Sequence, residues 1–232
     1  MKRVVLSIML LVTFSAITAF CVKPIPKLFL IGDSISIQYG PFLEEYLEGK
    51  IQFERKVDDG SAEKNLDIPT GANGGDSRMV LEYLRAKVED WQFTPDYLLL
   101  NCGLHDIKRN PESNKIQVSQ NEYRKNLEAI FQLLKHKEIQ VLWMRTTPVV
   151  DSIHNMKQKW FKRYAADLKI YNQIADEVCE KNNIAVIDLY DFTQKLGVGQ
   201  FADHVHFKEN ARALQAAYIT GFLEKYIKKS DY

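Results

Sequence analysis

Short apolar runs recur along the chain, and segments of helical periodicity separate them. The first run, residues 28–31, reads Leu-Phe-Leu-Ile between Pro26 and Gly32. A wholly apolar run of this length that is bounded by turn-forming residues is typical of a buried strand. By the same criterion we expect four further strands, at residues 51–57, 97–101, 139–144 and 184–189. In residues 51–57, apolar and polar residues alternate imperfectly.

The segments between these runs place apolar residues at helical spacing. Ser119 to Glu122 matches a helix capping box, and Asp76 or Ser77 stands where an N-cap would. Strands that alternate with helices predict an α/β fold with a parallel sheet, in which ligands bind at the carboxyl ends of the strands. We expect helices at residues 41–47, with Pro41 in the first turn and Gly49 past the end, at 77–88, 119–134, most of 151–181, and 208–227.

The first residues have the order of a secretory signal: a basic start, a short apolar run and then small residues. The apolar run is too short for a membrane span. We therefore expect a signal peptide over residues 1–19, with residue 21 as the alternative end, and an exported single domain over residues 20–232. The weaker alternative is that this segment is the first strand of the fold. The residues concerned are Lys2, Arg3, 4–12, Ser15, Ala16 and Ala19.

Charge and cysteine content narrow the function classes further. The formal net charge of +1 becomes −1 when Lys2 and Arg3 are removed, so nothing here attracts nucleic acid. Cys21 stands where a lipid-modified cysteine would follow a signal, although the preceding residue is a bulky phenylalanine. Cys102 and Cys179 make no disulfide framework, and Cys102 is expected to be a small buried residue.

Four polar motifs follow apolar strands or open a late helix. They are Gly32-Asp33-Ser34, the glycine-rich run at residues 73–77, Gly103-Leu104-His105-Asp106, and Asp203-His204-Val205-His206. In this order the motifs resemble the sequence blocks of the GDSL or SGNH hydrolases, over about residues 28–226. The resemblance implies a flavodoxin-like three-layer sandwich, with a central five-stranded parallel sheet and helices on both faces.

The resemblance also implies a catalytic triad. Ser34 would be the nucleophile, His206 the general base and Asp203 the carboxylate that orients the imidazole. An aspartate three residues before a histidine can bond one ring nitrogen while the other faces the serine. Such a reaction needs no metal or organic cofactor. The plainer alternative is that Asp203 and His206 are surface residues that cap the last helix.

The oxyanion site implied by the family would use the backbone N–H groups of Ser34 and Gly75. The alternative for Gly75 is a tight turn and nothing more. Residues 75–77 repeat the Gly-Asp-Ser sequence, but a polar loop and not an apolar strand leads into them, so Ser77 is not the expected nucleophile.

His105 is where the chain departs from the family. An asparagine usually stands at this position and donates its side-chain N–H to the oxyanion, and one imidazole N–H could replace it. Asn101 lies nearby on an extended strand, so its side chain should point elsewhere. The alternatives are a histidine held in the turn by Asp106, or a metal site with His204 and His206, whose spacing fits no zinc-ligand pattern.

Aromatic and basic residues gather near residue 160. Trp160, Phe161 and Tyr164 could form a flap that stacks on a sugar or covers an acyl chain. The favoured alternative is the apolar face of a helix whose lysines are solvated.

The sequence therefore predicts an exported serine esterase whose partner is a small-molecule or glycan ester, with deacetylation of a carbohydrate as the first choice. The Gly-x-Ser-x-Gly pattern of another serine-esterase class is absent around Ser34. A lysophospholipase or general short-chain esterase is the second reading, and it would use an acyl tunnel lined by Leu104, Ile107 and the Trp160 segment. An acyltransferase and a catalytically weakened glycan-binding relative are further alternatives. The oligomeric state is open.

Overall fold

The computed structural model describes residues 24–230, which form an α/β sandwich around one sheet. The predicted signal peptide at residues 1–19 and Cys21 lie outside the described residues. The sheet has the strand order β2-β1-β3-β4-β5, and every neighbouring pair is parallel. Its strands are β1 (Lys27–Ile31), β2 (Gln52–Arg55), β3 (Tyr97–Leu100), β4 (Gln140–Met144) and β5 (Ala185–Ile187).

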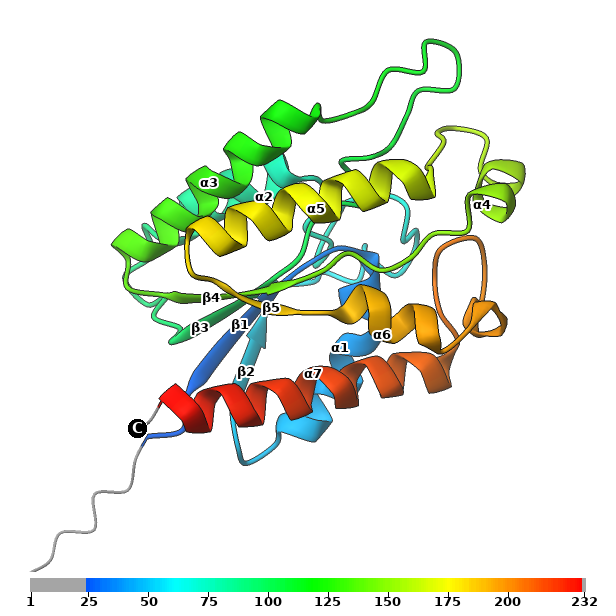
Figure 1. The fold of residues 1–232 in the computed structure, drawn as a ribbon. Helices are drawn as coiled ribbons and strands as arrows, with labels where there is room; N and C mark the ends of the chain where they lie inside the picture. Colours follow the sequence, from blue (N-terminus) through cyan, green and yellow to red (C-terminus); the bar gives the residue numbers. More distant parts are fainter. Residues whose placement is uncertain (1–23, 231–232) are drawn as a thin grey trace, which may run out of the picture.

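Helices cover both faces of the sheet (Figure 1). One layer contains α1 (Ser34–Leu47), α6 (Leu189–Lys195) and α7 (Glu209–Ser230), and the other contains α2 (Ser77–Lys87), α3 (Gln120–His136) and α5 (Ala165–Lys181). The short helices α4 (Asp151–Lys157) and η1 (Val198–Gln200) lie beyond the carboxyl ends of the strands. The predicted five-stranded parallel sheet with helices on both faces is confirmed. Among the described helices, none is long and apolar enough to cross a membrane.

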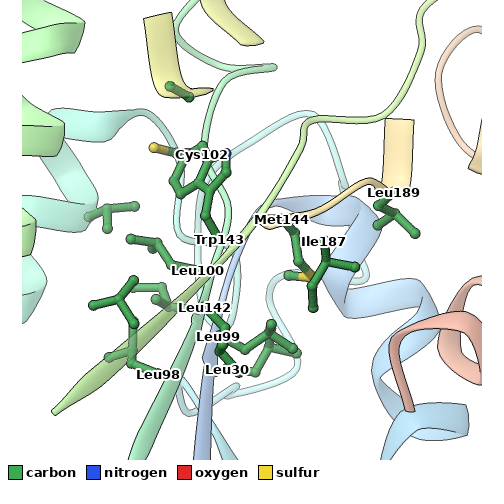
Figure 2. Close-up of a cluster of buried hydrophobic side chains, with 14 of the residues drawn as sticks. Leu30, Leu98, Leu99, Leu100, Cys102, Leu142, Trp143, Met144, Ile187 and Leu189 are labelled. Carbon is green, nitrogen blue, oxygen red and sulfur yellow. The ribbon is translucent and has the colours of Figure 1, made fainter. Parts of the chain in front are cut away.

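The core forms on both faces of the sheet because its central strands are apolar at every position. Leu98 and Leu100 of β3 point to one side and Leu99 to the other (Figure 2). On the first side Trp143, the register partner of Leu100, lies edge-on to Phe131 of α3, with 6.2 Å between the ring centroids. A continuous apolar run is what a strand buried on both faces requires.

Two element boundaries differ from the expectation. Helix α1 begins at Ser34 and contains Pro41 in its interior, because Asp33 caps the helix and Pro41 does not start it. The fifth strand ends at Ile187, and Asp188 then caps the unpredicted helix α6 by accepting a hydrogen bond from the Asp191 N–H at 3.0 Å. In both places a capping aspartate sets the start of the helix.

The segment expected to be mostly helical over residues 151–181 is interrupted. Helix α4 ends at Lys157, α5 starts at Ala165, and residues 158–164 have no helical structure. Trp160 is 86% exposed in this break, and Phe161 is partly buried. The expectation that these aromatic residues form the apolar face of a helix is therefore wrong.

Pro41 supplies a test of how α1 is built. Proline has no N–H to donate to the carbonyl of Ile37, so we expect Pro41→Ala to raise the free energy of unfolding by about 1–3 kcal/mol. Urea unfolding followed by circular dichroism measures the change. Pro111→Ala, an exposed loop position, is the control and should leave stability unchanged or slightly lower. An equal rise in the free energy of unfolding in both variants would contradict the explanation that Pro41 removes a hydrogen bond from α1.

Candidate active site

Ser34 is placed by the turn from β1 into α1. The strand ends at Ile31, the chain passes through Gly32 and Asp33, and Ser34 is the first residue of the helix. The Asp33 carboxylate accepts a hydrogen bond from the Ile35 N–H at 2.9 Å, which fixes the helix start. The N–H of a first helical residue has no partner within the helix, and the N-terminus carries partial positive charge. The turn thus displays a hydroxyl beside a free amide.

Ser34, His206 and Asp203 form one hydrogen-bond chain. The His206 Nε2 atom lies 2.9 Å from Ser34 Oγ, and Nδ1 lies 2.7 Å from Asp203 Oδ2. The other carboxylate oxygen accepts the backbone N–H groups of Val205 and His206, each at 2.8 Å. Burial acts to raise the pKa of Asp203, but the hydrogen bonds from His206 outweigh it and hold the pKa well below its usual range. The carboxylate therefore stays ionised.

The geometry of the chain suits proton transfer from the serine. A neutral imidazole that donates Nδ1–H to a carboxylate presents Nε2 as an acceptor for a hydroxyl. Ser34 and His206 are 4% and 3% exposed, so water competes little for these bonds. His206 is bonded to Ser34 and is not the surface residue of the plainer alternative. The structure brings together all three residues of the expected triad, and their catalytic roles stay predictions.

Gly75 lies beside this turn in a conformation that requires glycine. Its φ is +74°, and a Cβ atom there would lie 2.5 Å from the Met79 Sδ atom. The loop is tied to the nucleophile turn because the Gly74 N–H donates to the Gly32 carbonyl at 2.8 Å. The Gly75 N–H itself donates to Asn73 Oδ1 at 3.0 Å, so this amide already has a partner. Its role as an oxyanion donor stays a prediction.

Two residues that could be mistaken for site residues have other partners. Ser77 is fully buried at the start of α2, where its N–H donates to Asp106 Oδ1 and its hydroxyl accepts from Asn126, both at 2.9 Å. The Asn101 side chain donates to the Met144 carbonyl at 2.8 Å. Ser77 thus joins two loops, and Asn101 points toward the end of β4, as the strand geometry predicts.

His105 is a buried neutral residue. It is 1% exposed, and burial lowers its pKa well below the usual range, with the charges of Lys108, Arg163 and His206 acting in the same direction. Its Nδ1 atom has no hydrogen-bond partner within the described residues, and no hydrogen bond there joins His105 to Asp106. An unpartnered ring nitrogen is what a donor to an incoming ligand would require, and the donor role itself stays a prediction.

Two buried cations near His105 were not expected from the sequence. Arg163 is 2% exposed, its Nε donates to the Leu104 carbonyl at 2.7 Å, and burial lowers its pKa to about 10. Lys108 is 8% exposed, its Nζ donates to the Asp67 carbonyl at 2.9 Å, and burial lowers its pKa to about 7. Both lie over the ring of Phe161, at 4.7 and 4.3 Å from its centroid. Arg163 therefore adds positive charge beside the site, and Lys108 does so when it is protonated.

Asp67 connects these cations to the loop that holds Asp203 and His206. Its carboxylate lies 3.8 Å from Arg163 Nη1 and 3.5 Å from His204 Nε2. Burial acts to raise the pKa of Asp67, but the hydrogen bond with His204 and the charge of Arg163 lower it to about 2. On its other side, His204 Nδ1 lies 2.9 Å from His154 Nδ1 of α4. His204 therefore links the loop at Asp67 to helix α4.

Leu104 and Ile107 do not line an acyl tunnel. They are 1% and 0% exposed and belong to the main hydrophobic core. Within residues 24–230, no group of three or more His, Cys, Asp or Glu side chains is arranged to hold a metal ion.

With this geometry established, comparison with known proteins gives the family. The sequence profile of the GDSL-like Lipase/Acylhydrolase family matches residues 30–214. The chain belongs to this family. The resemblance to the GDSL hydrolases that the sequence motifs predict is thus confirmed. Membership of this family supports the hydrolysis of esters as the activity of the chain. No curated protein sequence matches the chain.

Solved structures show the same fold at low sequence identity. A lipase/acylhydrolase from Enterococcus faecalis is 19% identical, with 87% of this chain and 96% of that chain covered and a TM-score of 0.64. The acetyl xylan esterase AlAXEase is 19% identical, with 83% and 97% covered and a TM-score of 0.59. The acetylxylan esterase Axe2 from Geobacillus stearothermophilus is 16% identical, with 84% and 92% covered and a TM-score of 0.59. At these identities the likeness concerns the fold.

His105 gives the first test of this site. If its N–H is an oxyanion donor, His105→Ala should lower kcat for a chromogenic acetate ester by about 10²- to 10³-fold, because one donor is lost. His105→Asn should keep most of the activity, because the amide supplies a donor. Thermal unfolding of both variants controls for loss of fold. Full activity in the alanine variant would contradict the donor role.

Asp106 gives a test of stability against pH. Burial raises its pKa from 3.8 to about 7, so between these values the folded protein holds a proton that the unfolded chain has lost. The free energy of unfolding should therefore fall as pH rises through this window, by up to about 1.4 kcal/mol per pH unit from this group.

Asp106→Asn removes the titration and keeps an oxygen to accept the Ser77 N–H. We expect urea unfolding at pH 4.5, 6 and 7.5 to show a flatter pH dependence in this variant than in the wild type. Asp59→Asn is the control, because Asp59 is an exposed carboxylate whose pKa is lowered and which titrates below the window. Parallel curves for the wild type and Asp106→Asn would refute the assignment.

Proposed function

We propose that the protein is an exported serine esterase that hydrolyses an acyl ester through a covalent acyl-serine intermediate. The observation that carries the proposal is the continuous hydrogen-bond chain from Ser34 Oγ through His206 to Asp203. Such a chain supplies a nucleophile, a base and a group that orients the base. Export rests on the composition of residues 1–19, and Cys21 is the position at which a lipid would be attached.

The reaction would run in two halves. Ser34 Oγ attacks the ester carbonyl while His206 Nε2 takes its proton, and the same nitrogen then protonates the leaving alcohol. Water then attacks the acyl carbon while His206 takes its proton, and the bond from that carbon to Ser34 Oγ breaks as His206 returns the proton to Oγ, which releases the acid. Asp203 stabilises the imidazolium in both halves and keeps Nδ1 as the bonded nitrogen.

The negative charge that develops on the carbonyl oxygen would be held by backbone and side-chain donors. The Ser34 N–H at the start of α1 is one of them, and the helix N-terminus favours the charge. The Gly75 N–H would join when it exchanges Asn73 Oδ1 for the oxyanion. His105 would donate in place of the family's asparagine.

A small acyl group on a carbohydrate is the proposed substrate. Two structures with this fold are acetyl xylan esterases, and that activity comes to this chain as part of the proposal. Leu104 and Ile107 are buried in the core, which removes the feature that favoured a long acyl chain. A short acetyl group needs no tunnel.

Acid release from a panel of esters tests the proposal. We expect the wild type to release acetate from acetylated xylo-oligosaccharides and p-nitrophenyl acetate, and to act poorly on p-nitrophenyl esters of long acids. Ser34→Ala should lower kcat by about 10⁴-fold or more, because the nucleophile is lost. Ser77→Ala is the matched control at the second Gly-Asp-Ser and should keep its kcat, provided that it folds.

The outcomes separate the alternatives. Activity that survives in Ser34→Ala would refute the acyl-serine mechanism. A preference for long acids would refute the choice of a small acyl group and favour a lysophospholipase. No turnover of any ester would favour a glycan-binding relative, and transfer of the acetyl group to an added sugar in place of water would favour an acyltransferase.

A further inference from the structure

A cavity of about 460 Å³ lies between residues 108–117 and residues 160–161. Its lining includes three cationic and two aromatic side chains, and none of its lining residues, all within residues 24–230, carries a carboxylate. The main ones are Lys108, Arg109, Lys115, Gln117, Trp160 and Phe161.

The cavity walls are held together by backbone hydrogen bonds between three segments. The Arg109 and Lys162 backbones exchange hydrogen bonds at 2.8 and 2.9 Å. On the other side of the same segment, the Gln117 N–H donates to the Lys108 carbonyl at 2.7 Å and the Asn110 N–H to the Lys115 carbonyl at 3.0 Å. Residues 108–110 thus lie between residues 115–117 and residues 160–162. A wall built in this way is ordered before any ligand arrives.

The three cationic side chains of the cavity differ in whether a carboxylate pairs with them. Arg109 is committed, because its guanidinium makes two hydrogen bonds to Asp167, at 2.6 and 2.8 Å. Lys108 donates to a neutral backbone carbonyl, and Lys115 is exposed and pairs with no carboxylate among the described residues. Lys115 therefore has no anionic partner among the described residues, and Lys108 makes no ion pair there, although the charges of Asp67, Asp76 and Asp33 favour its protonated form.

Lys108 also connects the cavity to the reaction centre. It comes three residues after His105, and its N–H donates to the His105 carbonyl at 3.3 Å. Its charge acts on the carboxyl group of Asp33, the residue before Ser34. The cavity thus begins three residues from His105, the candidate oxyanion donor.

The lining indicates what kind of ligand fits. Trp160 offers an aromatic face that is 86% exposed, and aromatic faces pack well on the flat C–H faces of sugar rings. Asn110 Nδ2 and Gln117 Oε1 make no hydrogen bond among the described residues and could bond hydroxyl groups, whereas Asn110 Oδ1 accepts from Ser113 and Gln117 Nε2 donates to Asp76. A lipid chain would instead require an apolar lining.

We propose that this cavity is a subsite for an anionic sugar unit of the ester-bearing glycan, with Lys115 and Lys108 facing its carboxylate or sulfate and Trp160 stacking on its ring. The inference rests on the proposed function only in taking the anionic sugar to belong to the same glycan as the ester. Burial lowers the pKa of Lys108 to about 7, so an anion in the cavity would favour its protonated form.

Direct binding of ester-free trisaccharides to the full chain tests the subsite without relying on catalysis. The probes are trigalacturonate, a sulfated galactotriose and neutral xylotriose, measured by isothermal titration calorimetry at neutral pH. We expect at least one anionic probe to bind about three- to tenfold more tightly than xylotriose, which is the gain from one or two ion pairs. That margin should shrink at high salt.

The variants should give two different patterns. Lys115→Gln should weaken binding of the anionic probe by about threefold and leave binding of xylotriose unchanged. Trp160→Ala should weaken binding of every probe. The matched controls Lys228→Gln and Trp91→Ala are at exposed positions outside the cavity and should change nothing.

Each result decides the proposal. Preference for trigalacturonate assigns the subsite to carboxylates, preference for the sulfated probe assigns it to sulfates, and equal preference supports a general anionic subsite. The inference is wrong if neither anion binds more tightly than xylotriose, or if Lys115→Gln and Lys228→Gln behave alike. Anion binding without turnover of any ester would reject the proposed hydrolase and keep the subsite.

Discussion

The short distance between Ser34 and His206 depends on the packing of α1 against α7. Ser34 is the first residue of α1, and His206 lies just before α7, 172 residues later. The two helices lie side by side on one face of the sheet (Figure 1), and Lys50, three residues past the end of α1, pairs at 2.7 Å with Glu224 of α7. A hydrogen bond of 2.9 Å tolerates little sliding of one helix along the other. The geometry of the site is thus set by the core.

The parts of the fold that could be predicted are those with a local signal. Apolar runs between turn residues located all five strands, and the Ser119 cap located α3. Pro41 misled the prediction of α1, since its frequent role as a first helical residue outweighed the cap at Asp33. Helix α6 follows β5 directly, and its apolar first residue, Leu189, continued the pattern of the strand.

The same distinction holds at the site. Ser34, Asp203 and His206 were found because motif order and short spacing identify them, and the structure brings them together. Lys108, Arg163 and Asp67 were missed because nothing in their sequence neighbourhood distinguishes them from solvated charges. Their burial follows from contacts between distant loops, such as the 3.8 Å approach of Arg163 to Asp67. No periodicity or spacing could have revealed that.

The three segments that line the cationic cavity indicate how such a protein could change which ligand it binds. The hairpin at residues 110–115 carries Lys115 but none of Ser34, His206 and Asp203. Its two ends are joined by the hydrogen bond from the Asn110 N–H to the Lys115 carbonyl. Exposed hairpins tolerate substitution and insertion better than elements that contribute to the core. On the proposed roles, Lys115 would contribute to ligand choice from a stretch of chain separate from the triad, so that residue could diverge while the triad is retained.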